Sequence, residues 1–196
     1  LGSIVPNTIL MGDSQSPKHR NSYCKMIAQI HQAKRNVVIF RENPQRGFGK
    51  RRRIDIWWGE SMQANGGLML LLADLLRSDL RWREANIYIK LVVDHQSAVI
   101  PARDSLNRLL RQSRISAAPQ IIVADGRSFD RILQETSRNA DITFLGMATP
   151  DKHFPQHYEQ LLRKVDGLPS TAFVLAAPNS SFLEMFQDFE EDNFET

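Results

Sequence analysis

One short glycine-containing segment has residue types that could bind phosphate. Residues 47–50 read GFGK, and glycines followed by a lysine occur in loops that hold phosphate through backbone N–H groups. Neither known pattern is complete: Arg52 stands where a dinucleotide loop needs a third glycine, and Arg51 stands where a phosphate loop needs Ser or Thr. We therefore do not expect a nucleotide to bind through this loop.

Two histidines, a serine and a cysteine could each contribute to a site. His153 and His157 have the spacing of two ligands on one helix face, but Pro155 lies between them and no Glu or Cys joins them, which favours surface or capping roles. Ser14 lacks the flanking glycines of a nucleophile elbow. Cys24 falls on the apolar side of a predicted helix, with no base beside it, which favours a buried thiol. No catalytic, cofactor-binding or metal-ligating residue is predicted.

A tryptophan pair and a glycine pair mark the middle of the chain. Trp57 and Trp58 are adjacent in a predicted strand and must point to opposite faces, where we expect both to pack in the core. Asp55 shares the face of Trp57 and needs a partner if it is buried, but the sequence does not identify that partner. The glycine pair at 66–67 could present N–H groups to an anion, although a tight turn before a buried helix is the more usual use. Without convergent polar groups, a binding or regulatory module is favoured over an enzyme.

Charge is unevenly distributed along the chain. Residues 1–53 carry a balance of +9, residues 54–177 balance to zero, and residues 178–196 carry −6. The basic excess peaks at Arg46, Lys50, Arg51, Arg52 and Arg53. Such a run favours an anionic neighbour, namely lipid headgroups, nucleic acid or the acidic end of this same chain. A solvated or disordered loop is the other interpretation.

Composition narrows the class of protein. The 196 residues are 42% hydrophobic and 24% charged, which is typical of a packed soluble domain and excludes a chain that is disordered throughout. A single cysteine excludes an internal disulfide and favours a reducing compartment. No apolar run approaches the roughly 18 residues that span a bilayer. Because the sequence opens at Leu1, close to a predicted strand, we expect it to be part of a longer protein.

Short apolar runs alternate with helical patterns along most of the chain. Strands are predicted at 8–11, 36–41, 54–58, 86–93, 120–124, 141–146 and 171–176. Helices are predicted at 23–30 with Asn21 or Ser22 as N-cap, at 68–77 as a helix buried on all sides, at 101–111, after Ser128, and at 158–165 with Gly167 as its stop. This alternation predicts an α/β fold, a mostly parallel sheet flanked by helices on both faces.

The pattern divides into two α/β halves and a tail. The halves cover residues 1–85 and 86–177, as one continuous domain, and residues 178–196 form an acidic amphipathic tail. In the tail, Phe182, Met185, Phe186 and Phe189 fall on one helical face. That face could dock on its own domain, dock on a second subunit, or stay loose.

Several of these stretches together resemble the cytosolic C-terminal domain of the cation–chloride cotransporters, the Na–K–Cl and K–Cl symporters. They are VPNTILMG at 5–12, IDIWW at 54–58 followed by GGLMLLL at 66–72, LRWR at 80–83 with the strand after it, LLRQSRI at 109–115, and the strands at 141–146 and 171–176. The combined spacing of IDIWW and GGLMLLL is the most specific part. The connection between 124 and 141 is shorter than in the animal members, which removes the long phosphorylatable insertion and points to a microbial member.

The resemblance implies a fold and a role. The fold would be an α/β domain of two related halves, distantly similar to universal stress proteins. The domain would lie at the cytoplasmic face of the cell membrane, form a homodimer and regulate symport of Na⁺, K⁺ and Cl⁻ by its own transmembrane domain, without enzymatic activity or cofactor. Anionic lipid could bind Arg46, Lys50, Arg51, Arg52 and Arg53, whereas nucleic acid is not expected. The alternative is a nucleotide-binding, stress-protein-like sensor.

Overall fold

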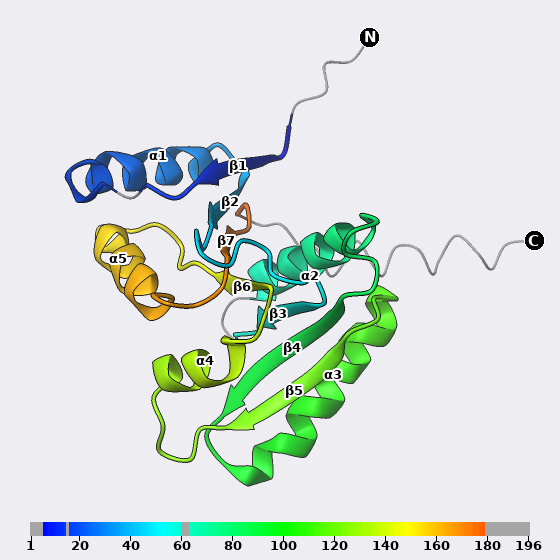
Figure 1. Ribbon diagram of the computed structural model, residues 1–196. Helices are drawn as coiled ribbons and strands as arrows, with labels where there is room; N and C mark the ends of the chain where they lie inside the picture. The colour runs from blue at the N-terminus through cyan, green and yellow to red at the C-terminus, as the bar shows by residue number, and fades with distance from the viewer. Residues whose placement is uncertain (1–5, 15, 60–62, 179–196) are drawn as a thin grey trace, which may run out of the picture.

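One mixed sheet forms the centre of the molecule (Figure 1). The computed structural model describes residues 6–14, 16–59 and 63–178, and within them the strand order is β1-β2-β7-β6-β3-β4-β5. The strands are β1 (Thr8–Gly12), β2 (Asn36–Arg41), β3 (Arg53–Trp57), β4 (Asn86–Val93), β5 (Ala118–Val123), β6 (Ile142–Gly146) and β7 (Thr171–Leu175). All neighbouring strands are parallel except β2 and β7. The predicted α/β fold with a mostly parallel sheet is confirmed.

Helices cover both faces of this sheet (Figure 1). They are α1 (Arg20–Gln32), α2 (Gln63–Arg77), α3 (Val99–Ser113), α4 (Phe129–Ser137) and α5 (Phe154–Lys164), with short 3-10 turns η1 (Pro17–His19) and η2 (Gln96–Ala98). Helices α2 and α3 pack on one face, while α1, α4 and α5 pack on the other. Each face therefore has its own hydrophobic core, and strands covered on both sides must be apolar on both sides.

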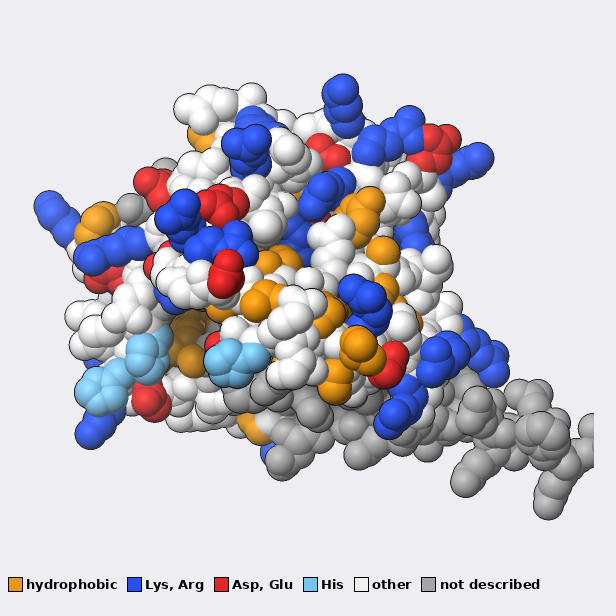
Figure 2. All heavy atoms as spheres, turned by 90° about the horizontal axis from the view of Figure 1, so that it is seen from below, with side chains coloured by type: hydrophobic (Ala, Val, Ile, Leu, Met, Phe, Trp, Pro, Cys, Tyr) orange, Lys and Arg blue, Asp and Glu red, His pale blue; other side chains and the backbone are white. Residues whose placement is uncertain are grey.

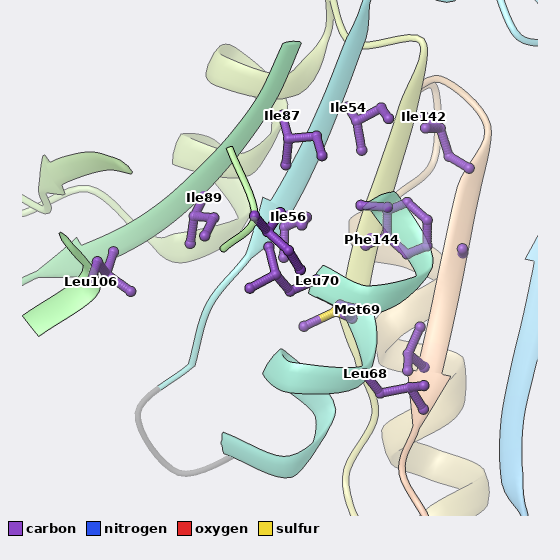
Figure 3. Close-up of a cluster of buried hydrophobic side chains, with 14 of the residues drawn as sticks. Ile54, Ile56, Leu68, Met69, Leu70, Ile87, Ile89, Leu106, Ile142 and Phe144 are labelled. Carbon is purple, nitrogen blue, oxygen red and sulfur yellow. The ribbon is translucent and has the colours of Figure 1, made fainter. Parts of the chain in front are cut away.

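The core under α2 shows how the sequence produces these layers (Figure 3). Ile54 and Ile56 of β3 alternate with side chains that point to the opposite face, and both are fully buried against Leu70 of α2 and Ile89 of β4. Complete burial of one such side chain contributes about 1.5–3 kcal/mol. The IDIWW strand and the leucine-rich helix after it are thus held together mainly by this core.

Two predicted helix starts are wrong. Helix α1 begins at Arg20 because the 3-10 turn at Pro17–His19 leads straight into it, so neither Asn21 nor Ser22 is its N-cap. Helix α2 begins at Gln63, so the glycine pair at 66–67 lies inside the helix and does not form a turn before it. Nor is α2 buried on all sides, since Leu75 is 66% exposed.

Two other helix boundaries agree with the prediction. The Ser128 hydroxyl accepts a hydrogen bond from the Arg131 N–H at 3.3 Å, as an N-cap does. Gly167 lies just beyond α5 with φ of +75°, a backbone conformation that favours glycine. These local signals could be interpreted correctly because they need no distant partner.

The sheet joins the two predicted halves, since β3 pairs with β4 across the 85/86 boundary. That division stays a prediction. The apolar stripe predicted at residues 182–189 lies outside the described residues. Among the helices of the described part, none is both long and apolar enough to cross a membrane.

Candidate functional site

The sheet has one point where its winding reverses, between β3 and β6. From β3 the chain winds outward through β4 to β5, and it then returns to the other side of β3 to form β6 and β7. The helices that follow β3 and β6, namely α2 and α5, lie on opposite faces. The connections after these two strands therefore diverge, and open parallel sheets bind ligands in the crevice that this leaves.

A cavity of about 290 Å³ occupies this crevice. Aromatic and apolar side chains dominate its walls: Trp57, Trp58, Met69, Phe129, Phe154, Tyr158 and Leu161. Figure 2 looks at the molecule from below Figure 1, the side toward which β4 and β5 point, and shows a recessed hydrophobic patch between histidine side chains. The crevice is thus a small apolar hollow at the position where this topology places ligands.

Two of the polar side chains at the cavity have a carboxylate nearby. Lys164 Nζ lies 3.1 Å from a carboxylate oxygen of Asp130, and His157 Nδ1 lies 4.0 Å from one of Asp151. The sequence after β6 has no glycine-rich phosphate loop. The arrangement suits a planar or apolar group better than a phosphate.

Beneath the cavity lies a buried polar network that holds Trp57. Asp55 and Lys90 are both fully buried, and Lys90 Nζ lies 2.6 Å from Asp55 Oδ2. Ser137 joins them, because its hydroxyl donates to Asp55 at 2.8 Å and accepts from Trp57 Nε1 at 3.0 Å. Burial lowers the pKa of Lys90, and the carboxylate of Asp55 opposes that shift. Arg53 completes the network with Nε 2.9 Å from Asp55 Oδ1.

This network supplies the partner that sequence reasoning could not give for Asp55. The signal was the lysine inside the apolar run NIYIKLVV, since a charge in a doubly covered strand needs an opposite charge nearby. As predicted, Trp57 and Trp58 lie on opposite faces, one in each core. Gly66 is explained too, because a Cβ there would lie 2.7 Å from ring carbons of Trp58. The spacing between IDIWW and the glycine pair thus places a glycine of α2 against the second tryptophan.

The basic loop, residues 42–52, is folded against the protein and does not form a phosphate site. The Asp141 carboxylate accepts hydrogen bonds from the backbone N–H groups of Lys50, Arg52 and Arg53 at 2.7–2.9 Å. A Cβ at Gly49, which has φ of +48°, would overlap that carboxylate. The glycines of the GFGK segment therefore serve the approach of the loop to Asp141.

The five basic residues of the predicted lipid site differ in their surroundings. Arg53 binds the buried Asp55, Arg52 pairs with Glu84, and Arg46 donates to the backbone carbonyl of Arg138. Lys50 and Arg51 form no side-chain ion pair with the residues described. The structure therefore places four of the five in the basic loop and Arg53 at the start of β3, and it leaves Lys50 and Arg51 for an external anion.

The other candidate residues lie apart. His153 is the residue before α5, Pro155 is in the first turn, and the rings of His153 and His157 are 6.3 Å apart at their centres. In the described part of the chain, no three His, Cys, Asp or Glu side chains gather as metal ligands would. Cys24 is buried in α1, and burial raises the pKa of its thiol. The carbonyl of Ser14 accepts from Arg20 at 2.9 Å.

A second hollow, of about 750 Å³, lies between the end of β2 and α5. Most of its charges are paired: Arg41 lies 3.4 Å from Asp166, and Arg163 lies 2.7 Å from Glu159. It is wide and polar, and it lies away from the β3–β6 crevice. We regard it as the weaker candidate.

Sequence reasoning missed a polar clamp where the chain leaves β7. The Asn36 side chain accepts from the Ala177 N–H at 2.8 Å and donates to the Thr8 hydroxyl at 3.0 Å. His31 Nε2 lies 3.1 Å from the carbonyl oxygen of Ala176, and Asn65 accepts from the N–H of Ala176 at 2.7 Å. All three clamping side chains are buried. The start of β1 and the chain just after β7 are thus both bound to Asn36 at the start of β2, which lies between them.

Comparison with known proteins gives the fold an external reference. No family model matches the sequence. The structure is similar to the cytoplasmic domain of a prokaryotic cation chloride cotransporter, with a TM-score of 0.72 and 21% identity, over 94% of this chain and 69% of that one. It is also similar to a universal stress protein from Archaeoglobus fulgidus, with a TM-score of 0.56 and 12% identity, over 89% of this chain and 62% of that one. The expected likeness to both folds is therefore confirmed.

Proposed function

We propose that this chain is the cytosolic regulatory and dimerisation domain of a secondary-active cation–chloride cotransporter. The fold likeness to such a domain over 94% of the chain carries the proposal. The combined IDIWW and GGLMLLL motif supports it, because the motif resembles that of the cotransporter family; in this structure its spacing places Gly66 against Trp58. Transport of Na⁺, K⁺ and Cl⁻ would belong to a membrane domain joined ahead of β1, and this domain would have no enzymatic activity of its own.

The full-length gene tests this proposal first. We expect the reading frame upstream of residue 1 to encode a series of membrane-spanning helices, and the whole protein to carry ⁸⁶Rb⁺ only when Cl⁻ is present. Removal of this domain should change the flux per transporter at the membrane, as measured against surface-labelled protein. An upstream sequence without membrane helices, or a flux indifferent to Cl⁻, would contradict the assignment.

Dimerisation needs its own measurement. Sedimentation equilibrium of the isolated chain at tens to hundreds of micromolar should show self-association. A chain that stays monomeric across that range would place dimer formation in the membrane part and remove it from this domain.

Anionic lipid is the partner proposed for Lys50 and Arg51. The chain enters β1 beside the start of β2, whereas the basic loop follows the end of β2. The six residues of β2 separate these two points by about 17 Å. If the membrane domain joins closely ahead of β1, lipid contact places the axis of β2 along the membrane surface. Binding to phosphatidylserine vesicles at low salt should fall in the Lys50→Ala/Arg51→Ala variant and not in Arg108→Ala/Arg111→Ala, a matched loss of two exposed bases on α3. Equal binding to neutral vesicles would exclude this partner.

A nucleotide sensor is the second candidate, favoured by the cavity at the β3–β6 switch point. Titration calorimetry with ATP and ADP separates the two functions. If a nucleotide binds there, Lys164→Ala should weaken it while Arg163→Ala, one residue away but outside the cavity, should not. Absence of heat at millimolar nucleotide would remove this candidate and leave the cotransporter proposal intact.

A further inference from the structure

One face of the sheet is incompletely covered, beside α2. Helix α2 packs on β3, β6 and β7, and α1 covers β2 from the opposite face. On the α2 side, no helix of the described residues packs closely on β1, whereas β2 is covered: Val38 is buried in that core, and Phe40 stacks on Phe48 of the basic loop. Leu10 of β1 lies in register with Val38 of β2, whose side chain belongs to the core on that side, and Leu10 is 71% exposed.

The strip between Leu10 of β1 and the near flank of α2 has the width of one helix. Helices pack 8–10 Å apart, and strands are about 4.8 Å apart, so the next helix position beside α2 falls two strands further along, over β2 and β1. Figure 3 shows Leu68 of α2 beside β7. Leu72 and Leu75 follow Leu68 at helical spacing along the same flank, and Leu75 is 66% exposed. Exposed leucines thus border this strip from both sides.

The chain leaves the sheet at the end of this strip. Ala177 is held by Asn36, whose side chain shares the α2 side of β2 with Val38, because residues two apart in a strand face the same way. Residues 179–181 then precede Phe182, Met185, Phe186 and Phe189, which are spaced as one apolar helical stripe. Eight residues of helix span about 12 Å, which fits within the length of β1 and β2.

We propose that residues 182–189 of this same chain dock on the strip between Leu10 of β1 and the Leu72–Leu75 flank of α2, above the buried Val38 of β2. The three-residue connection after Pro178 favours this intramolecular site, because it starts where the strip starts. With the stripe buried, Glu184 and Asp188 project toward solvent, as their helical positions require. The proposal does not depend on the transporter assignment, since it uses only the sheet and the sequence that follows it.

Hydrogen exchange of the 196-residue chain tests the docking. Truncation after Pro178 should speed exchange of the β1 amides about tenfold while those of β5, the other edge strand, keep their rates. Phe186→Ser in the full-length chain should reproduce part of this effect. This variant provides the test if truncation impairs folding. Leu10→Ser should accelerate β1 exchange in the full chain but add nothing to the truncated one, since both changes remove the same contact.

The matched control is Ile100→Ser on α3, because Ile100 is 69% exposed and lies outside the strip. Ile100→Ser should leave the exchange rates of the β1 amides unchanged in both the full-length and the truncated chain. Unchanged exchange of β1 on truncation would overturn the proposal, as would independent effects of Leu10→Ser and truncation. Protection of β1 that grows with protein concentration would show that a second copy supplies the stripe, and the intramolecular site would then be rejected.

Discussion

Removal of either charge from the buried Asp55–Lys90 pair should strongly destabilise the domain. The two side chains are fully buried in adjacent strands, β3 and β4. A pair broken on one side leaves an uncompensated charge in the interior, which costs about 3–5 kcal/mol. That loss is a large part of the 5–15 kcal/mol by which domains of this kind are stable.

The structure also ranks the two single variants. The free energy lost in Asp55→Asn should lie near the upper end of this range, about 5 kcal/mol, because the substitution leaves both Lys90 and Arg53 facing a neutral amide. Lys90→Met should lie near the lower end, about 3 kcal/mol, because Asp55 keeps Arg53 and the Ser137 hydroxyl as donors. Replacement of both, as Asp55→Asn with Lys90→Met, removes both charges and should cost less than the sum of the two single losses by at least 2 kcal/mol.

Urea unfolding followed by far-UV circular dichroism measures these free energies, with an unchanged m-value as the check that both states are comparable. If Asp55→Asn fails to fold, recovery of soluble, cooperatively unfolding protein in the double variant gives the same answer. Strictly additive losses, or a single variant within 1 kcal/mol of the parent, would refute the reasoning.

Three further changes test other parts of the structure. Gly66→Ala should cost about 1–3 kcal/mol in the same urea assay, since its Cβ would meet the Trp58 ring, whereas Gly59→Ala, with open space around it, should cost little. Burial lowers the pKa of His31, so the folded state resists protonation; stability should be complete above the ordinary imidazole pKa of about 6.5 and fall as pH drops below it, and His31→Gln should flatten that fall. Thr143→Val should leave stability equal or slightly higher, because the Thr143 hydroxyl is buried without a hydrogen-bond partner among the described residues, and a loss above 1 kcal/mol would show a hidden partner.

The sequence was sufficient for the order of strands and helices because those signals are local. Nearly continuous apolar runs identify strands covered on both faces, and the Ser128 cap needs only its own first turn. The predicted start of α2 is too late because a glycine pair usually marks a turn. In the structure the Trp58 side chain, eight residues earlier, requires glycine at position 66, and a contact between two elements has no signature inside either one.

The candidate site was harder to predict for the same reason. Its cavity depends on where β6 inserts beside β3, and strand order is set by packing of the whole sheet. The basic loop shows the limit most clearly, because its orientation is determined by Asp141, which stands 88 residues or more away along the chain from each N–H group that it binds. A run of arginines cannot reveal which of its members face inward.

The clamp at Ala176 and Ala177 links the fold to the proposed regulatory role. A domain that regulates a membrane partner must transmit a change at its junction to the rest of its structure, and a junction held by one loose loop could not do so. Here Asn36 binds both Thr8 at the start of β1 and Ala177 after β7. The buried side chains of His31 in α1 and Asn65 in α2 bind the backbone of Ala176. Displacement of the chain ahead of β1 would therefore pull on the exit of β7 and, through it, on both helical layers. The same clamp fixes where residues 182–189 begin, so their docking on β1 and a displacement at the junction would be energetically coupled.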